Sequence, residues 1–527
     1  MTESQAAPAI AEAGPSLARS GGLIIVLSVI TLALGFGVQM ALAARLGTSR
    51  AMDVYLVAIT LPALGATVAV TVFPSALVPV LRGRLAAQDS LQGDSIFRFA
   101  FTLAAVVGMA AAIGVSAGAA FIVRVTAPGL VGADAEMAAG LLQVTAFGLA
   151  FDVPRGVLTA RQYALQRYLA PQAAPSLNHM ILLACALILL PRLGLGVMAA
   201  AWTAGSAAML ALLLLPSLHP LTRPGVSAAG WASLASLPAV LVVAALTQAT
   251  PVVDRWVAST LPEGAIASLG YGSKILEVMM RTLPMGLGLA LFPLLSEHAA
   301  RKRWVDFGEV AARTSRWLWL GTVPLTLVVV MLRQSWVVLL FERGDFDRAS
   351  SVAVAQALLW YGLAFIPASG AYFLSRAHYA LQDTRPLVQT AAMSLLGTLV
   401  LDLVFARKGG FAGIAAANLV VTSLASAYLA ARLWRQRLLP PPSFPSIASA
   451  GRVTAALLMA LILAVAGSRA GELLEDRNQL ALLVVISGCL SLALYVATLV
   501  VFRDPEVERV LRWVHPRLAN MLKARRP

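Results

Sequence analysis

Residues 266–297 read IASLGYGSKILEVMMRTLPMGLGLALFPLLSE, and this stretch decides the fold class. It is long and apolar enough to span a membrane, yet it contains Lys274, Glu277 and Arg281. Their spacing of i, i+3 and i+7 places the three side chains near one face of a helix. Charges at membrane depth are costly and usually face a bundle interior or a wet cavity. We therefore expect a substrate or coupling-ion site here; the alternative is an ion pair that only holds two helices together.

The second half of the same stretch favours a break in the helix. Pro284 is followed by Gly286 and Gly288, and the apolar run ends at Phe292-Pro293 before a basic loop. Proline removes a helical hydrogen bond, and interrupted helices occur in membranes where neighbours or a cavity satisfy the freed backbone groups. The sequence thus predicts an interrupted helix that ends at Pro293.

Composition indicates a polytopic membrane protein. Hydrophobic residues make up 59% of the 527 residues and charged residues only 12%, against about 25% charged in an ordinary soluble domain. The mean hydropathy is +0.81. The formal net charge of +15 lies in predicted loops and a tail, where membrane topology and anionic lipid explain it without nucleic acid. Cys185 and Cys489 lie in apolar runs, so no disulfide framework is expected.

Apolar runs of about twenty residues predict an all-α fold with about fourteen transmembrane helices. The predicted spans are 22–46, 54–81, 99–123, 137–160, 169–190, 196–218, 235–260, 266–297, 315–340, 352–375, 386–405, 411–431, 453–468 and 479–502.

The chain also repeats itself over the first twelve of these spans. The sequence GLAF at 148–151 recurs at 362–365, and YALQ at 163–166 recurs at 379–382. A Phe-Pro pair and a glycine followed by two alanines recur at nearly the same offset. Each copy holds six spans, an even number, so the two copies point the same way. Parallel repeats of this kind are typical of transporters that bind substrate between their halves.

The repeat and the composition together predict the domain organisation. Two parallel six-helix repeats form two lobes, and two additional helices follow them. The predicted parts are a disordered cytoplasmic N-terminus at 1–20, an N-lobe at 21–220, a C-lobe at 221–436, two additional helices at 437–502 and a basic cytoplasmic tail at 503–527.

Loop charges predict the orientation in the membrane. With both termini on one side, the loops and tail on that side carry 25 of the 40 Lys and Arg residues, and the opposite loops carry eleven. Because positive residues accumulate in cytoplasmic loops, both termini are expected in the cytoplasm.

Other charges also fall within or at the start of predicted spans. Arg255 is a further candidate for substrate binding, beside Lys274, Glu277 and Arg281. The candidates for coupling or gating are Asp53, Asp152, Arg155, Asp254 and Asp402. For Asp53 the alternative is a carboxylate at a helix start, and for Asp152 and Arg155, at i and i+3, it is an internal ion pair. We find no metal-ligand cluster, no phosphate-binding glycine loop and no nucleophile–base pair, so the sequence does not indicate an enzyme or a cofactor.

Several motifs resemble a known family. They are Leu34-Gly35-Phe36, Ala44-Arg45-Leu46-Gly47, Asp53, Leu61-Pro62, Phe73-Pro74 and Val78-Pro79, followed by LFERGDF at 340–346 and YALQDTRP at 379–386. The pattern is similar to the MurJ/MviN family of the MOP transporter superfamily, over about residues 22–435. The resemblance implies two V-shaped lobes, a central cavity and a bacterial cytoplasmic membrane location. It also implies flipping of an undecaprenyl-pyrophosphate-linked glycan, lipid II in the best-known members, by alternating access.

One departure from that family concerns the substrate. Its lipid II flippases carry cavity arginines at positions that correspond here to Leu32, Val38 and Ala66. The basic residue of the eighth span is present as Lys274, which keeps the charge but lacks the bidentate fork of arginine. A related lipid-linked oligosaccharide, as in exopolysaccharide or O-antigen export, is therefore an alternative to lipid II.

Two function classes remain beside glycan-lipid flipping. One is a cation-coupled small-molecule exporter of the MATE type, with Asp254, Glu277 or Asp402 as the coupling acid. The other is a scaffold for cell-envelope assembly that transports nothing. The expected partners are a polyprenyl-linked glycan lipid and membrane lipids, with cell-envelope synthesis proteins as further candidates. Coupling to the membrane potential, H⁺ or Na⁺ is left open.

Overall fold

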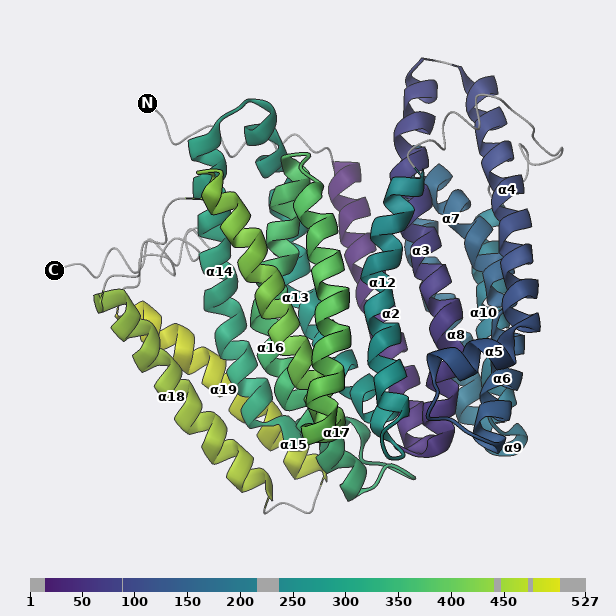
Figure 1. The fold of residues 1–527 in the computed structure, drawn as a ribbon. Coiled ribbons are helices and arrows are strands. Elements are labelled where there is room, and N and C mark those ends of the chain that lie inside the picture. Colours follow the sequence, from purple (N-terminus) through teal and green to yellow (C-terminus); the bar gives the residue numbers. More distant parts are fainter. Residues whose placement is uncertain (1–14, 88, 216–236, 440–446, 473–476, 503–527) are drawn as a thin grey trace. The chain divides into compact units, whose positions relative to one another are not determined.

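The computed structural model describes residues 15–87, 89–215, 237–439, 447–472 and 477–502, and every regular element within them is a helix (Figure 1). Twelve of these helices are long and apolar enough to cross a membrane. The predicted all-α polytopic fold is thus confirmed. The basic tail at 503–527 and residues 1–14 of the predicted disordered N-terminus at 1–20 lie outside the described residues. Residues 15–20, also predicted to be disordered, instead form the start of helix α2 (Pro15–Leu46).

The first repeat comprises the helices up to residue 214. Their bounds are α2 (Pro15–Leu46), α3 (Arg50–Ala86), α4 (Ser90–Ala117), α5 (Ala119–Thr126), α6 (Ala133–Thr145), α7 (Gly148–Ala164), α8 (Leu169–Ala184), the π-helical turn η1 (Cys185–Leu189), α9 (Leu190–Leu193) and α10 (Gly196–Leu214).

The second repeat and the additional helices follow from residue 237. Their bounds are α12 (Leu237–Ser259), α13 (Ala265–Ala300), α14 (Trp304–Met331), α15 (Arg333–Phe341), α16 (Arg348–Ala380), α17 (Arg385–Arg435), α18 (Ile447–Glu472) and α19 (Arg477–Val501).

The predicted count of about fourteen spans is approximate because some spans are broken and two are joined. The third span breaks at Gly118 into α4 and α5, and the ninth breaks at Leu332 into α14 and α15. The eleventh and twelfth spans are the two halves of α17, which changes direction at Gly410 with φ 56° and ψ −141°. α12 occupies the predicted seventh span, although it is not one of the twelve candidate membrane spans found among the described residues.

The predicted interruption of the eighth span is wrong. α13 is a continuous helix from Ala265 to Ala300, and both Pro284 and Pro293 lie inside it. Proline in a membrane helix costs one backbone hydrogen bond but need not end the helix. Gly288 serves close packing instead, since a Cβ there would lie 2.7 Å from the Cε1 atom of Tyr372 on α16.

The backbone confirms the internal repeat at positions where the chain adopts positive φ. Gln166 has φ 59° and Gln382 has φ 57°, and each closes a copy of the YALQ sequence at the end of a helix. At each position the glutamine N–H donates to the carbonyl oxygen three residues earlier, and the next N–H donates to the carbonyl oxygen five residues earlier. This pattern is typical of helix ends at which a residue adopts the left-handed conformation. The glycines with positive φ pair in the same way, as Gly47 with Gly264, Gly132 with Gly344 and Gly194 with Gly410.

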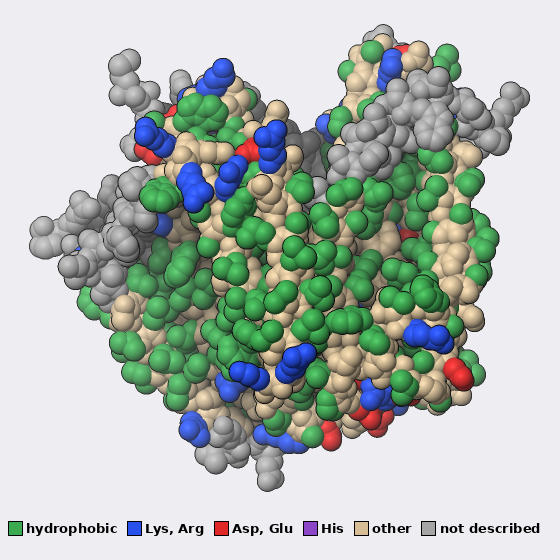
Figure 2. All heavy atoms as spheres, viewed as in Figure 1, with side chains coloured by type: hydrophobic (Ala, Val, Ile, Leu, Met, Phe, Trp, Pro, Cys, Tyr) green, Lys and Arg blue, Asp and Glu red, His purple; other side chains and the backbone are tan. Residues whose placement is uncertain are grey.

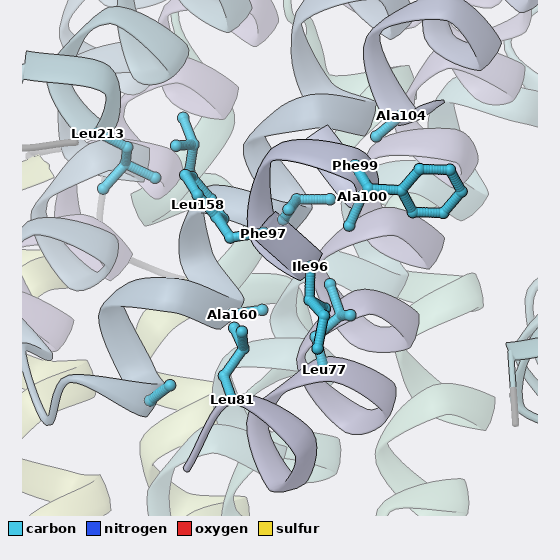
Figure 3. Packing of buried hydrophobic residues seen from close by; sticks show 12 residues of the cluster. Leu77, Leu81, Ile96, Phe97, Phe99, Ala100, Ala104, Leu158, Ala160 and Leu213 are labelled. Carbon is cyan, nitrogen blue, oxygen red and sulfur yellow. The ribbon is translucent and has the colours of Figure 1, made fainter. Parts of the chain in front are cut away.

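The described chain divides into two compact units, Met1–Ala267 and Ser268–Pro527. In the first unit α3 packs along α7, α4 and α12, and buried residues of α3, α4, α7 and α10 form one hydrophobic cluster (Figure 3). The approach of α3 to α7 requires Gly156, whose Cβ would lie 2.5 Å from the carbonyl oxygen of Ala69. Small residues at contacts of this kind are typical of membrane helices. The lobe boundary at residue 220 rests on the sequence repeat and stays a prediction.

In the second unit α16 packs along α17, and α18 packs along α19. A hydrophobic cluster joins α13, α14, α16 and α17 around the buried rings of Phe307 and Phe373. Many large apolar side chains are nevertheless exposed, among them Ile462 and Leu396. Figure 2 shows hydrophobic side chains over much of the visible surface of the helices, with most of the Lys and Arg nearer the helix ends. This distribution suits helices surrounded by lipid.

Candidate functional site

The three charged residues of α13 form one connected group. The Nζ atom of Lys274 donates to Oε2 of Glu277 at 2.9 Å. From the other side Arg281 donates to Oε1 of Glu277, at 2.8 Å from Nη2 and 3.1 Å from Nε. The i, i+3, i+7 spacing therefore brings the three side chains together as predicted. One carboxylate is shared by two cations, and the group carries a net charge of +1.

This α13 charge triad is accessible although its helix is long enough to cross a membrane. The side chains of Lys274, Glu277 and Arg281 are 23%, 39% and 49% exposed. The triad begins about 13 Å from the start of α13 and reaches to about 24 Å, at 1.5 Å per residue. A charged group at such a depth favours contact with water or with a polar ligand over contact with hydrocarbon.

An aromatic cluster holds α13 one turn before the triad. The ring of Tyr271 lies 5.1 Å from that of Phe341 and 5.5 Å from that of Phe346, and the last two rings are 5.8 Å apart. All three residues are fully buried. Gly272 adds a close contact with α16, because a Cβ there would lie 3.2 Å from the Cβ of Ala357. The loop after α15 therefore fixes the part of α13 that precedes Lys274.

Asp152 and Arg155 of α7 form an ion pair of a different kind. Nη2 and Nε of Arg155 lie 2.7 and 2.8 Å from Oδ1 of Asp152. The hydroxyl of Ser206 on α10 donates to the other carboxylate oxygen at 2.8 Å. The side chains of Asp152 and Arg155 are only 1% and 9% exposed. This arrangement supports the alternative of an internal ion pair, and the predicted coupling or gating role stays a prediction.

Asp53 is buried at the start of α3 and binds the start of another helix. Its Oδ2 accepts from the backbone N–H of Gly264 and its Oδ1 from that of Ala267, both at 2.8 Å. The contact is reciprocal, because Glu263 accepts from the backbone N–H of Arg50 at 2.7 Å. Carboxylates stabilise helix N-termini by satisfying free N–H groups. The contacts support the alternative of a helix-start carboxylate, although the helix that Asp53 caps is α13 and not its own. Its predicted coupling or gating role stays a prediction.

Arg255 and Asp254 lie near the end of α12, within the first compact unit. Arg255 donates to the hydroxyl of Thr60 and, at 3.3 Å, to the carbonyl oxygen of Leu56, both on α3. These contacts tie α12 to α3. The predicted role of Arg255 in substrate binding and the predicted coupling role of Asp254 stay predictions.

Asp402 lies in the first half of α17 and is fully buried. Thr398 precedes it by one turn on the same face and is buried as well. The second half of α17 runs back alongside, since Gly413 approaches the carbonyl oxygen of Phe405 and Gly397 approaches Val421.

Among the residues that the structure describes, no group of His, Cys, Asp and Glu could hold a metal ion. Sequence reasoning missed Ser206, Thr60 and Glu263, which carry no signal because their partners lie more than fifty residues away in the chain. It also missed the aromatic cluster, although Phe341 and Phe346 belong to the LFERGDF motif at 340–346 that the sequence singled out.

Comparison with known proteins identifies the family. The family model described as "Lipid II flippase MurJ" matches residues 42–475. The chain belongs to this family. Among its relatives, a probable lipid II flippase MurJ of Vibrio cholerae is 26% identical over 80% of this chain and 82% of the relative. The lipid II flippase MurJ of Burkholderia cenocepacia is 25% identical over 72% of this chain and 76% of the relative.

Solved structures agree at the level of the fold. A lipid II flippase MurJ in an inward closed conformation has a TM-score of 0.75 at 17% identity, covering 92% of this chain and 99% of that one. An inward-facing MATE family transporter of the MOP superfamily has a TM-score of 0.68 at 12% identity, covering 79% and 98%. The predicted family resemblance is confirmed. The chain is a multi-pass inner-membrane protein with a transporter fold.

Proposed function

We propose that this protein moves a polyprenyl-pyrophosphate-linked glycan across the cytoplasmic membrane by alternating access. The observation that carries the proposal is the α13 charge triad, which presents two cations on a membrane-spanning helix and remains accessible. Membership of a family named for lipid II flipping supports it. A lipid-linked pyrophosphate requires cations at membrane depth, whereas its polyprenyl tail can remain in the surrounding lipid.

The two cations contribute different chemistry. The guanidinium of Arg281 is a planar fork that can bind two phosphate oxygens at once, whereas the ammonium of Lys274 is a compact point charge. Because Glu277 holds both cations on one face, a phosphate group that approaches this face meets both of them. We assign Lys274 and Arg281 to binding of the pyrophosphate.

The identity of the glycan is a separate question, and lipid II is the first candidate because of the family. A related lipid-linked oligosaccharide is the second candidate. Its support comes from three positions in the first unit where arginines were expected and where Leu32, Val38 and Ala66 stand. The side chain of Val38 is buried, so it packs the helices rather than binding a phosphate.

The test is flipping of fluorescent glycan lipids by the full chain in proteoliposomes, with lipid II and a lipid-linked oligosaccharide compared side by side. Lys274→Ala should abolish flipping while folded protein remains in the membrane. Lys274→Arg should retain much of the activity, because the positive charge survives. The faster substrate of the unmodified protein identifies the glycan.

A double variant separates a substrate site from an ion pair that only supports the fold. If the triad were structural, Lys274→Ala combined with Glu277→Ala would restore both the amount of folded protein and the flipping. Under our proposal the double variant stays inactive even where its abundance is normal. An active double variant would remove the site assignment.

The proposal also covers the coupling of glycan-lipid transport to an ion gradient. We infer that Asp402, a buried carboxylate on a membrane helix, is a coupling acid for H⁺ or Na⁺, because ionisable groups inside membrane helices commonly mark ion pathways. Asp402→Asn should make flipping independent of the gradient that drives the unmodified protein. If that variant responded to H⁺ and Na⁺ gradients as the unmodified protein does, the role of Asp402 would be excluded.

The orientation of the termini follows from the loop charges, and we propose that both lie in the cytoplasm. Fusions of a reporter that is active only in the cytoplasm should be active at Arg303 and Gln436 and inactive at Asp345. Activity at Asp345 would reverse the topology.

A further inference from the structure

Both oxygens of the Glu277 carboxylate accept hydrogen bonds from Lys274 and Arg281, the two cations that we assign to binding of the pyrophosphate. Oε2 accepts from Lys274 at 2.9 Å, and Oε1 accepts from Arg281 at 2.8 Å. A phosphate group would use the same donors. Carboxylates are planar and phosphates are tetrahedral, but both present anionic oxygens that guanidinium and ammonium groups bind in similar ways. Glu277 therefore occupies the positions that the substrate needs.

We propose that Glu277 is a built-in competitor that makes this site selective for pyrophosphate over the singly charged phosphodiesters of ordinary phospholipids. The inference rests on the proposed function of the α13 charge triad. Its basis is a comparison of charges. A phosphodiester carries one negative charge, the same as the carboxylate of Glu277, so it gains little attraction to the cations by replacing that carboxylate. A pyrophosphate linked to a glycan carries two negative charges, so it is attracted more strongly to Lys274 and Arg281 than Glu277 is.

The exposure of the triad allows this exchange. Ion pairs between part-exposed side chains at i, i+3 and i, i+4 are weak, because water solvates both partners. Glu277 and Arg281 are 39% and 49% exposed, so a more highly charged ligand can replace the carboxylate without exposing a buried charge. The buried pair of Asp152 and Arg155 could not exchange in this way.

The same geometry explains how substrate would leave. Glu277 is on the same helix as both cations, one turn from each, so it remains within reach of them while the ligand is bound. When the pyrophosphate departs, the carboxylate re-forms its pairs with Lys274 and Arg281. Glu277 thereby lowers affinity for every anion, limits occupation by abundant phospholipids and shortens the residence of the substrate.

The experiment measures binding of undecaprenyl pyrophosphate to the full chain in nanodiscs by native mass spectrometry. One set of nanodiscs contains phosphatidylcholine only, and a second contains phosphatidylglycerol as a singly charged competitor. Glu277→Gln should lower the dissociation constant in the neutral discs by about threefold to thirtyfold, the range expected for the loss of two weak ion pairs. Phosphatidylglycerol should then weaken binding to Glu277→Gln much more than to the unmodified protein.

Glu297→Gln is the matched control. Glu297 lies on the same helix and pairs with Arg301 at 3.1 Å and i, i+4, with 48% of its side chain exposed. The substitution changes the charge by the same amount away from the triad, so it should change neither the affinity nor the effect of phosphatidylglycerol. Glu277→Ala provides a second variant with the same expectations as Glu277→Gln if the latter yields too little folded protein.

The outcomes distinguish this inference from the proposed function. If Lys274→Ala weakens binding and Glu277→Gln does not tighten it, the competitor role is wrong and the phosphate site stands. If Lys274→Ala leaves binding unchanged, both fail. Equal sensitivity of Glu277→Gln and the unmodified protein to phosphatidylglycerol would also overturn the selectivity.

Discussion

Two ion pairs with the same spacing in sequence have opposite surroundings in this protein. Asp152 and Arg155 stand at i and i+3 on α7, and Lys274 and Glu277 stand at i and i+3 on α13. The first pair is buried and completed by Ser206 from α10. The second is accessible and completed by Arg281 of its own helix. Spacing determines that two charges meet, but the neighbouring helices determine whether a ligand can reach them.

The difference has a packing origin. α7 contacts α3, α4 and α10, and its glycines allow very close approach, as at Gly156 against the backbone of Ala69. Asp152 and Arg155 are therefore largely excluded from water. On α13 the aromatic cluster around Tyr271 lies one turn before Lys274, and the side chains of the triad are themselves partly exposed. The first pair therefore stabilises the fold, and the second belongs to the binding site that we propose.

Among the substitutions that test this comparison, Asp152→Ala should have the largest effect. It leaves the guanidinium of Arg155 buried without its carboxylate partner, which should lower the free energy of unfolding by about 3–5 kcal/mol. Folded protein, measured by gel filtration of the detergent-solubilised chain, should nearly disappear, whereas Lys274→Ala should retain it. Equal losses in the two variants would abolish the distinction between a structural pair and an accessible one.

A smaller effect is expected from the aromatic cluster that anchors α13. Phe346→Leu removes ring contacts with Tyr271 and Phe341 and should destabilise the protein by about 2 kcal/mol. Thermal unfolding in nanodiscs measures this loss. Because α13 would then be held less firmly before Lys274, the affinity for undecaprenyl pyrophosphate should fall as well. Unchanged affinity in folded Phe346→Leu protein would show that the cluster does not position the triad.

Asp53→Ala should cost about 1–2 kcal/mol, because it removes a carboxylate that caps the N-terminus of α13. Asp53→Asn should cost less, since an amide oxygen can still accept from one of the two N–H groups. Thermal unfolding of the two variants gives the comparison. A larger loss for Asn than for Ala would contradict the capping role.

The smallest effect concerns Asp347, which lies outside the membrane-spanning segments and caps α16. Its carboxylate accepts from the backbone N–H of Ser350 at 2.8 Å, and this hydrogen bond holds the pKa of Asp347 below its ordinary value of 3.8. A lowered pKa in the folded state stabilises the protein above pH 3.8, and the contribution is lost as the pH falls further and the carboxylate is protonated.

Asp347→Ala should therefore reduce stability by about 1 kcal/mol at neutral pH and by less at pH 3. Unfolding of this variant and of the unmodified protein at the two pH values measures the difference. An effect that grew on acidification would have the wrong sign for a capping carboxylate.

The sequence alone was sufficient for the membrane class, the helices, the repeat and the family. These features depend on local composition and on motifs at fixed spacing, such as the two copies of YALQ and the run LFERGDF. It also identified the charged triad, because i, i+3 and i+7 positions on one helix must lie near one another whatever surrounds them. It failed at Pro284, where a proline that predicts a break is accommodated within a continuous α13.

Only the tertiary structure decided which charges are accessible and which residues complete them. Ser206 reaches Asp152 across 54 residues of sequence, and Asp53 caps a helix that begins more than two hundred residues later. Such contacts depend on how helices pack, and small residues such as Gly156 set that packing by their lack of a side chain. The exposure of the α13 triad likewise depends on how other helices pack, and the residues of α13 alone do not determine it.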